Sequence, residues 1–211
     1  MNKAAILSGL LGFLVLSAAP VLLAQTDEEM VEAEWERRVN ARQPPEAIMD
    51  AIGLKPGMII ADIGAGTGRV AVWLARRVGP RGKVYANDID AEAVDRIWAR
   101  AKRLGFQNVS TVVGKSDDPL LPAGALDIAF MTNVYHHMEK PQAMLAAIRP
   151  SLKPDGILVI VERDPAKSSY KAEATPREDM IRQLSEAGYE MVRIETFLSE
   201  DNIYIARPKK Y

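Results

Sequence analysis

The chain has 211 residues, which suits one α/β domain with a full hydrophobic core and an N-terminal extension. Its 27 Lys and Arg residues nearly balance its 28 Asp and Glu residues, and no basic block marks a surface for nucleic acid or anionic lipid. Because the chain contains no cysteine, disulfides and thiolate metal sites are excluded.

The N-terminal segment is apolar. Residues 4–24 follow a single cation, Lys3, and small residues lie near the end of the run. This pattern predicts a secretory signal over residues 1–24, with cleavage after Ala19 or Ala24. The run is also close to the length of a bilayer span, so an uncleaved membrane anchor is the alternative. Both interpretations predict an exported domain, periplasmic or secreted, whose only membrane contact is this segment if it is uncleaved.

Residues 25–57 are expected to form a helical extension, with one helix over 26–40 and a second over 45–51, after the break at Gln43-Pro44-Pro45. Strands and helices then alternate in a single domain over residues 58–211. Strands are expected at 58–62, 83–87, 109–113, 126–131 and 156–162, and helices at 68–78, 91–104, 141–150 and 176–187. Two closing strands, at 190–196 and 202–207, have no helix between them.

This order of elements predicts an α/β fold. We expect a doubly wound, mostly parallel sheet of seven strands, with helices on both faces. The last two strands, joined directly, predict a hairpin and therefore an antiparallel strand at one edge of the sheet. Ligands of such sheets bind beyond the carboxyl ends of the parallel strands, so the functional residues are sought there.

The most informative motif joins the first strand of this domain to its first helix. It reads Asp62-Ile63-Gly64-Ala65-Gly66-Thr67-Gly68-Arg69. Its three glycines let backbone N–H groups approach a ligand closely at a helix N-terminus, which favours a negative charge. A dinucleotide-binding motif would place its third glycine at position 69, and the Gly-Lys-Ser/Thr ending of a P-loop is absent.

This D-x-G-x-G-x-G pattern resembles the first motif of the class I S-adenosylmethionine-dependent methyltransferases. The resemblance covers roughly residues 45–206 and is strongest from 58 to 162. It implies that Asp62 accepts from the ammonium group of S-adenosylmethionine, while the helix N-terminus at 66–68 favours the carboxylate. It also implies that an acid at the end of the next strand, Asp88, holds both ribose hydroxyls. Asp90 competes for that role but is better placed as the N-cap of the following helix.

Recognition of the adenine is expected after the third strand. Many relatives place an acid directly after a glycine at this point, but this chain has Lys115 there, so the contact is expected to shift to Ser116, Asp117 or a backbone group. A solvated turn is the alternative for Asp117. The expected cofactor-binding residues are Asp62, Gly64, Ala65, Gly66, Gly68, Asp88, Ile89, Ser116, Asp117 and Asn133.

The two histidines of the chain are adjacent, after the fourth strand, in a segment that resembles the family's NVLHH type: Asn133-Val134-Tyr135-His136-His137. On a helical turn they would face different directions, which argues against a metal site. His137 is the first catalytic candidate, since it could accept a proton from a substrate hydroxyl or orient it, and His136 is the second. The alternative is a structural histidine bonded to a backbone carbonyl. Tyr135 and Arg163 are expected to contact the substrate.

The sequence therefore predicts a methyltransferase that transfers the sulfonium methyl group of S-adenosylmethionine to a small-molecule acceptor, with neither a metal nor a nucleic-acid partner. Lys115 and the export signal support a second hypothesis, an exported S-adenosylmethionine-binding protein or sensor without methyl transfer. A nucleotide-dependent oxidoreductase is a third hypothesis, and Arg69 in place of the expected glycine argues against it.

Overall fold

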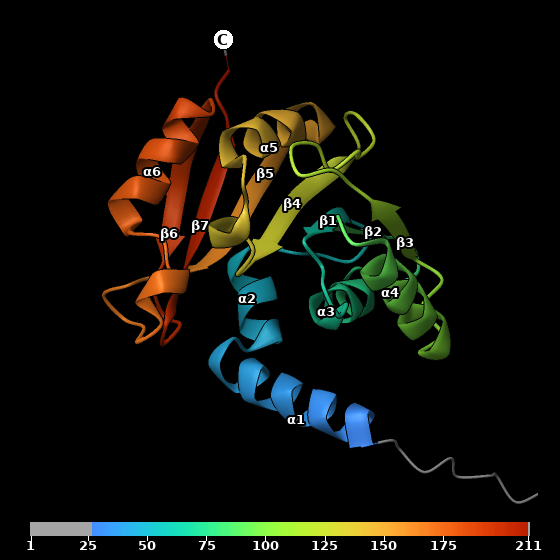
Figure 1. Ribbon diagram of the computed structural model, residues 1–211. Coiled ribbons are helices and arrows are strands. Elements are labelled where there is room, and N and C mark those ends of the chain that lie inside the picture. The colour runs from blue at the N-terminus through green and yellow to red at the C-terminus, as the bar shows by residue number, and fades with distance from the viewer. Residues whose placement is uncertain (1–26, 211) are drawn as a thin grey trace, which may run out of the picture.

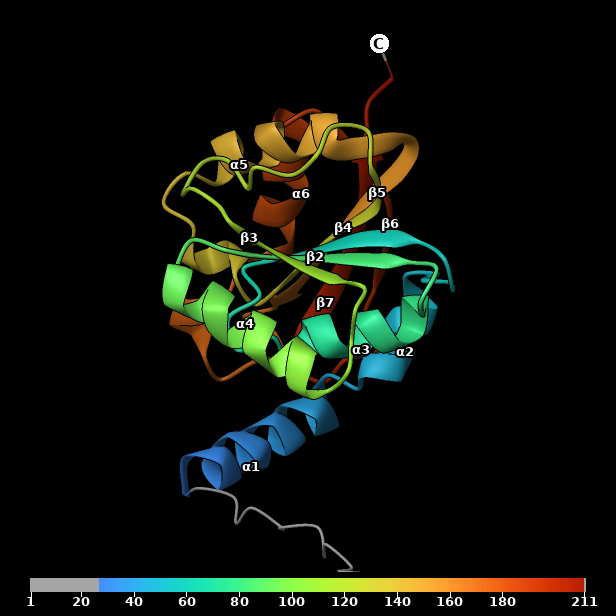
Figure 2. The same ribbon diagram turned by 90° about the vertical axis from the view of Figure 1, so that its right-hand side faces the viewer.

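A seven-stranded sheet runs through the molecule, with helices on both of its faces (Figure 1, Figure 2). The computed structural model describes residues 27–210, so the predicted signal or anchor segment lies outside the described residues. Within that described range, none of the helices combines the length and the apolar character needed to span a bilayer.

The strands occur in the spatial order β3-β2-β1-β4-β5-β7-β6. They are β1 (Ile59–Ile63), β2 (Lys83–Asp88), β3 (Val109–Val113), β4 (Leu126–Thr132), β5 (Leu152–Arg163), β6 (Tyr189–Glu195) and β7 (Asp201–Pro208). The helices are α1 (Asp27–Arg42), α2 (Pro45–Ala51), α3 (Arg69–Val78), α4 (Ala91–Arg103), α5 (Pro141–Ile148) and α6 (Arg177–Glu186). The short 3-10 helices are η1 (Tyr135–His137), η2 (Arg149–Ser151) and η3 (Lys171–Glu173).

The directions of the strands confirm the predicted fold class. Strands β1 to β5 pair in parallel, and β7 runs antiparallel to both β5 and β6. The closing hairpin therefore forms one edge of the sheet, and its reversed strand, β7, lies one place in from that edge. Because β7 takes the position beside β5, β6 is left outermost and runs in the same direction as the parallel strands.

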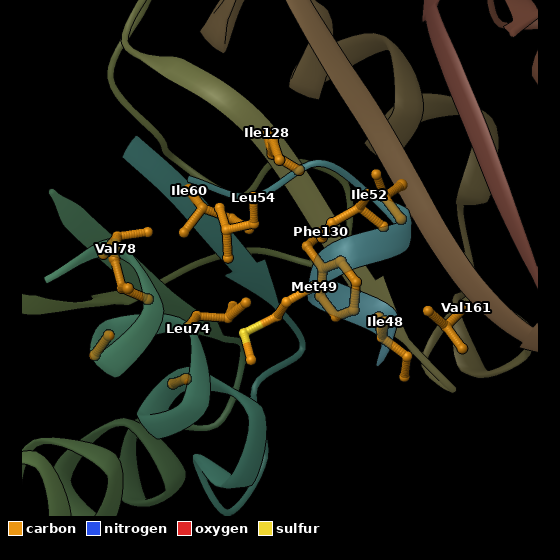
Figure 3. Packing of buried hydrophobic residues seen from close by; sticks show 14 of the residues in the cluster. Ile48, Met49, Ile52, Leu54, Ile60, Leu74, Val78, Ile128, Phe130 and Val161 are labelled. Carbon is orange, nitrogen blue, oxygen red and sulfur yellow. The ribbon is translucent and has the colours of Figure 1, made fainter. Parts of the chain in front are cut away.

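The hydrophobic core has two parts, one on each face of the sheet. Neighbouring residues of a strand point to opposite faces, so Ile60 packs in the first part and Ala61 in the second. Figure 3 shows the first part, where α2 and α3 cover the sheet and Met49 lies beside Phe130 and Leu74. The buried residues of α2 thus belong to the core of the domain, and the predicted boundary at residue 58 does not coincide with a break in packing.

Helix α1 lies outside the layer formed by α2, α3 and α4 (Figure 2). Polar contacts link it to that layer: Arg100 of α4 donates to Glu36 with an Nη2–Oε2 distance of 2.8 Å, and Arg69 of α3 donates to Asn40 over 2.7 Å. Val39, near its C-terminal end, is buried, whereas Trp35 is about half exposed. The C-terminal half of α1 is thereby held over the end of the sheet where the site lies.

Candidate functional site

Two cavities adjoin at the glycine turn between β1 and α3. The first has a volume of about 320 Å³ and the second about 290 Å³. Gly64 and His137 line both cavities, so the two meet at these residues. Both cavities open at the carboxyl ends of the parallel strands, as the fold class predicts.

The turn requires its glycines for two separate reasons. Gly64, Gly66 and Gly68 all have positive φ angles, of 71°, 54° and 75°, which other residues rarely adopt. In addition, a Cβ atom on Gly64 would collide with the Val134 side chain. Gly68 lines neither cavity and instead forms the N-cap of α3, where it has no side chain to accept from the first N–H groups of the helix. Those N–H groups remain suited to an anion.

Asp62 is the buried carboxylate beside the turn, and one of its two oxygens is unpaired in the described part of the chain. It is only 2% exposed, and within residues 27–210 its Oδ2 atom has no hydrogen-bond partner. Burial raises the pKa of this carboxyl from 3.8 to about 7, and the positive charge of Arg69 opposes that rise. A buried acceptor without a donor is costly, so the position favours a ligand that brings an N–H donor or a cation.

Asp88 ends β2 and connects it to the turn. Its Oδ2 accepts from the Gly66 N–H group over 2.8 Å, and its Oδ1 accepts from the Asp90 N–H group over 3.1 Å. Since each carboxylate oxygen can accept a second hydrogen bond, Asp88 keeps capacity for a ligand in the second cavity, which it lines. Asp90 is the N-cap of α4, as predicted, and accepts from the Glu92 N–H group over 2.9 Å.

The second cavity is mostly apolar and has the predicted Ile89 and Ser116 in its lining, together with Val134, Met138 and Met144. Asp117 was expected to contact the adenine, but this prediction is wrong, because Asp117 lines neither cavity. Its carboxylate instead pairs with Lys140 over 2.9 Å, and this contact lowers its pKa. Asp117 is therefore part of the solvated turn that was its alternative.

His136 and His137 have different surroundings. His136 lines the first cavity, and its Nδ1 atom lies 2.7 Å from Oε1 of Glu162, a fully buried residue of β5. The Nε2 atom of His136 is buried and has no partner among the described residues. His137 is exposed, its ring lies 4.0 Å from that of His136, and no described carboxylate contacts it. His136 is therefore the better candidate for a catalytic residue, whereas the sequence placed His137 first.

Tyr135 was expected to contact the substrate, but this prediction is also wrong. Its side chain packs in the second part of the core, only 4% exposed, and lines neither cavity. Its hydroxyl donates to Oε1 of Gln183 over 2.7 Å, and burial raises its pKa to about 12. The tight 3-10 turn directs neighbouring residues to different sides, so Tyr135 joins the core while His136 lines the cavity. Arg163 does line the first cavity, where it pairs with Glu173 and lies over the ring of Tyr170.

Several residues of the first cavity were not predicted. Arg69 is buried and donates to Asn40 and to Gln43, with an Nη2–Oε1 distance of 3.1 Å in the second case. Asp201, at the start of β7, is 2% exposed, and burial raises its pKa. Among these residues, Arg69 is the one that the sequence distinguishes, because it stands where a dinucleotide-binding motif would have its third glycine. The other lining residues come from distant parts of the chain: Trp35, Val39, Arg42, Gln43, Thr132, Glu173, Glu200 and Asp201.

The first cavity is short of hydrogen-bond donors. Five buried polar atoms around it have no partner within residues 27–210: Asp62 Oδ2, Thr132 Oγ1, Asn133 Oδ1, His136 Nε2 and Asp201 Oδ1. Asn133 also has a positive φ of 49°, a strained conformation for a residue other than glycine, of the kind that collects at functional sites. The cavity therefore suits a ligand with several donors and a positive charge.

Known proteins match this chain in sequence and in structure. Residues 60–156 match the family model described as a methyltransferase domain. The protein-L-isoaspartate O-methyltransferase of Ignicoccus hospitalis is 33% identical over 139 residues, which are 65% of this chain and 63% of that protein. The nocamycin O-methyltransferase of Saccharothrix syringae is 33% identical over 109 residues, 52% of this chain and 39% of that protein. The chain thus spans less than two thirds of the length of these curated relatives.

A solved structure matches over a larger share of the chain. The crystal structure of a SAM-dependent methyltransferase from Aquifex aeolicus superposes with a TM-score of 0.76 at 25% identity. This match covers 86% of the present chain and 98% of the other. Together with the sheet order and the glycine turn, these matches support a class I S-adenosylmethionine-dependent methyltransferase domain, with S-adenosylmethionine as its cofactor.

Proposed function

We propose that this chain transfers the methyl group of S-adenosylmethionine to a small-molecule acceptor that binds in the first cavity. The observation that carries the proposal is the buried Asp62 carboxylate, whose Oδ2 atom lacks a partner among the described residues beside the glycine turn. The ammonium group of S-adenosylmethionine would supply a donor to this unpaired oxygen and a positive charge beside the carboxylate.

The two cavities divide the cofactor between them in this proposal. Asp62 and the N-terminus of α3 would hold the ammonium and carboxylate groups in the first cavity. Asp88 would accept from the ribose, and the apolar lining with Ile89 and Ser116 would receive the adenine. The cofactor supplies a methyl group that is already activated, so the protein has to orient the acceptor and exclude water.

The acceptor would occupy the part of the first cavity away from the glycine turn. This part is lined by Trp35 and Arg42 of α1, by His136 and Arg163, and by Asp201. The printed names of the two relatives give different acceptors, and the same fold serves many substrates, so neither acceptor is carried over to this chain. The walls supplied by α1 favour a small acceptor over an extended one.

Export of the enzyme is part of the proposal. The apolar run over residues 4–24 behind Lys3 supports a signal or an anchor, which would send the domain across a membrane. Fractionation of cells that express the full chain, followed by N-terminal sequencing of the mature protein, tests this directly. An N-terminus near Gln25 in the exported fraction would support a cleaved signal, whereas intact chain in the cytosol would contradict export.

The activity is tested by two measurements on the purified protein. Calorimetric titration with S-adenosylmethionine should show binding that Asp62→Ala abolishes and that Arg207→Gln, a change in an exposed ion pair outside both cavities, leaves intact. Release of S-adenosylhomocysteine across a panel of small acceptors should then show turnover. Binding without turnover on any acceptor would support the exported binding protein or sensor instead, and absence of binding would contradict both.

A further inference from the structure

His136 and Glu162 form a buried pair at the wall of the first cavity. The His136 side chain is 7% exposed and that of Glu162 is fully buried. Three groups converge on the Glu162 carboxylate: the backbone N–H groups of His136 and Arg163, at 3.3 and 2.9 Å, and Nδ1 of His136, at 2.7 Å. The pair joins two elements, because His136 lies in η1 and Glu162 near the end of β5.

This arrangement fixes the tautomer of the imidazole. Both oxygens of the Glu162 carboxylate already accept from backbone N–H groups, so the carboxylate acts as an acceptor and Nδ1 of His136 is the atom that donates to it. In the neutral ring the lone pair then lies on Nε2. That atom is buried, belongs to a residue that lines the first cavity, and has no partner within residues 27–210. A histidine with a purely structural role would satisfy this second nitrogen as well, since a buried acceptor without a donor is destabilising.

We infer that His136, oriented by Glu162, is the general base of the reaction and that the methyl acceptor is a hydroxyl group. The inference rests on the proposed function. As the bond from the acceptor oxygen to the methyl carbon forms and the sulfur–carbon bond breaks, the hydroxyl proton moves to Nε2 of His136. The products are the methyl ether and S-adenosylhomocysteine, and the proton then passes from the imidazolium to solvent.

The structure favours a hydroxyl over an amine acceptor for a chemical reason. A neutral amine attacks with its own lone pair and loses its proton afterwards, so it does not need a positioned base beforehand. A hydroxyl is a weak nucleophile until its proton is removed, and a base within hydrogen-bond reach meets that need. Glu162 in turn stabilises the positive charge that the ring acquires, which is the role of the carboxylate in a carboxylate–histidine pair.

The test compares acceptors that differ only in the nucleophilic atom. Phenols, benzylic alcohols and hydroxy acids are each paired with the amine of the same skeleton, and release of S-adenosylhomocysteine is measured for both members. We expect turnover of hydroxyl acceptors. His136→Gln should lower kcat on them by roughly 10²–10⁴-fold, while the KM for S-adenosylmethionine stays within about twofold. Glu162→Gln should lower kcat at least tenfold, and added imidazole should restore part of the activity of His136→Ala.

A spectroscopic measurement on the unmodified protein avoids reliance on variants that could fold poorly. The chain has two histidines, so ¹⁵N NMR of histidine-labelled protein with bound S-adenosylhomocysteine resolves both rings, and His137→Asn identifies which signals belong to His136. We expect the tautomer that is protonated at Nδ1 for His136. The opposite tautomer, or turnover of amines without turnover of any hydroxyl acceptor, would overturn this inference alone. Binding of the cofactor without turnover of any acceptor would overturn the proposed methyl transfer as well. Failure to bind S-adenosylmethionine would overturn the proposed function with it.

Discussion

Replacement of Asp62 by asparagine should stabilise the cofactor-free protein and at the same time weaken cofactor binding. Burial is the main cause that raises the pKa of Asp62 from 3.8 to about 7. Since one pKa unit corresponds to about 1.4 kcal/mol, the ionised carboxylate lowers the free energy of unfolding by up to about 4 kcal/mol. An asparagine side chain at this position would carry no charge at any pH and would avoid this cost, although its amide also has to be satisfied in the cavity.

The direction of the pH dependence follows from the raised pKa. Between pH 3.8 and about 7 the folded state holds a proton at Asp62 that the unfolded state has lost, so stability from this group falls as the pH rises. The cost is absent below pH 3.8, grows through this range and is complete above about pH 7. The advantage of Asp62→Asn should therefore be largest near pH 8 and small near pH 4.

Urea unfolding of both proteins at these two pH values measures the effect, and comparison of the two proteins cancels the titration of all other groups. A bound ammonium group favours the ionised carboxylate, so wild-type protein should release close to one proton on binding S-adenosylmethionine near pH 6. Calorimetry in buffers of different ionisation enthalpy measures that proton. Equal stability of the two proteins near pH 8, or binding without proton release near pH 6, would show that burial does not raise the pKa of Asp62 in the cofactor-free protein.

Three further predictions follow from named contacts. Asp88→Ala should weaken S-adenosylmethionine binding by about 1.5–3 kcal/mol, as measured by calorimetry. Asp90→Ala should lower the free energy of unfolding by about 1 kcal/mol, because the N-cap of α4 is lost, and should leave the affinity unchanged. Equal affinities of the two variants would contradict the assignment of Asp88 to the ribose. Gly64→Ala should lower the unfolding free energy by at least about 3 kcal/mol, because strain at positive φ adds to a collision with Val134, while Gly66→Ala, at positive φ with open space around it, should cost about 1–2 kcal/mol. Similar losses in the two would rule out the collision. Glu36→Gln should speed hydrogen exchange in α1 about tenfold by weakening its link to Arg100. Glu34→Gln should not, since within residues 27–210 the ion pairs of Glu34 are with residues of α1 itself. Unchanged exchange in Glu36→Gln would show that other contacts hold α1.

Most of the fold could be predicted because its signals are local. Hydrophobic periodicity and the glycines and prolines between elements placed nearly every strand and helix within a few residues. The start of β5 was missed by four residues. Lys153-Pro154-Asp155-Gly156 has the composition of a turn, yet Leu152 already pairs with Leu126 ahead of a register shift between Leu126 and Ile128.

The sequence predicted those residues of the site that belong to a short motif with a known binding role. Asp62, Asp88 and the glycines follow from a short pattern at two neighbouring strand ends, and the structure places them around the two cavities, with Gly68 behind the turn. The assignment of Tyr135 and the order of the two histidines depended on which way a single 3-10 turn faces, and periodicity does not determine that. Asp201 and Gln43 reach the cavity through long-range packing, for which the sequence offers no local signal.

A crystal structure of the protein with S-adenosylhomocysteine would show which residues hold the cofactor. We predict that the ligand ammonium group lies about 3 Å from the Asp62 carboxylate and that the adenosine occupies the second cavity, beside Asp88 and Ile89. An empty glycine turn in crystals grown with saturating ligand, or a ligand bound away from Asp62, would contradict this prediction.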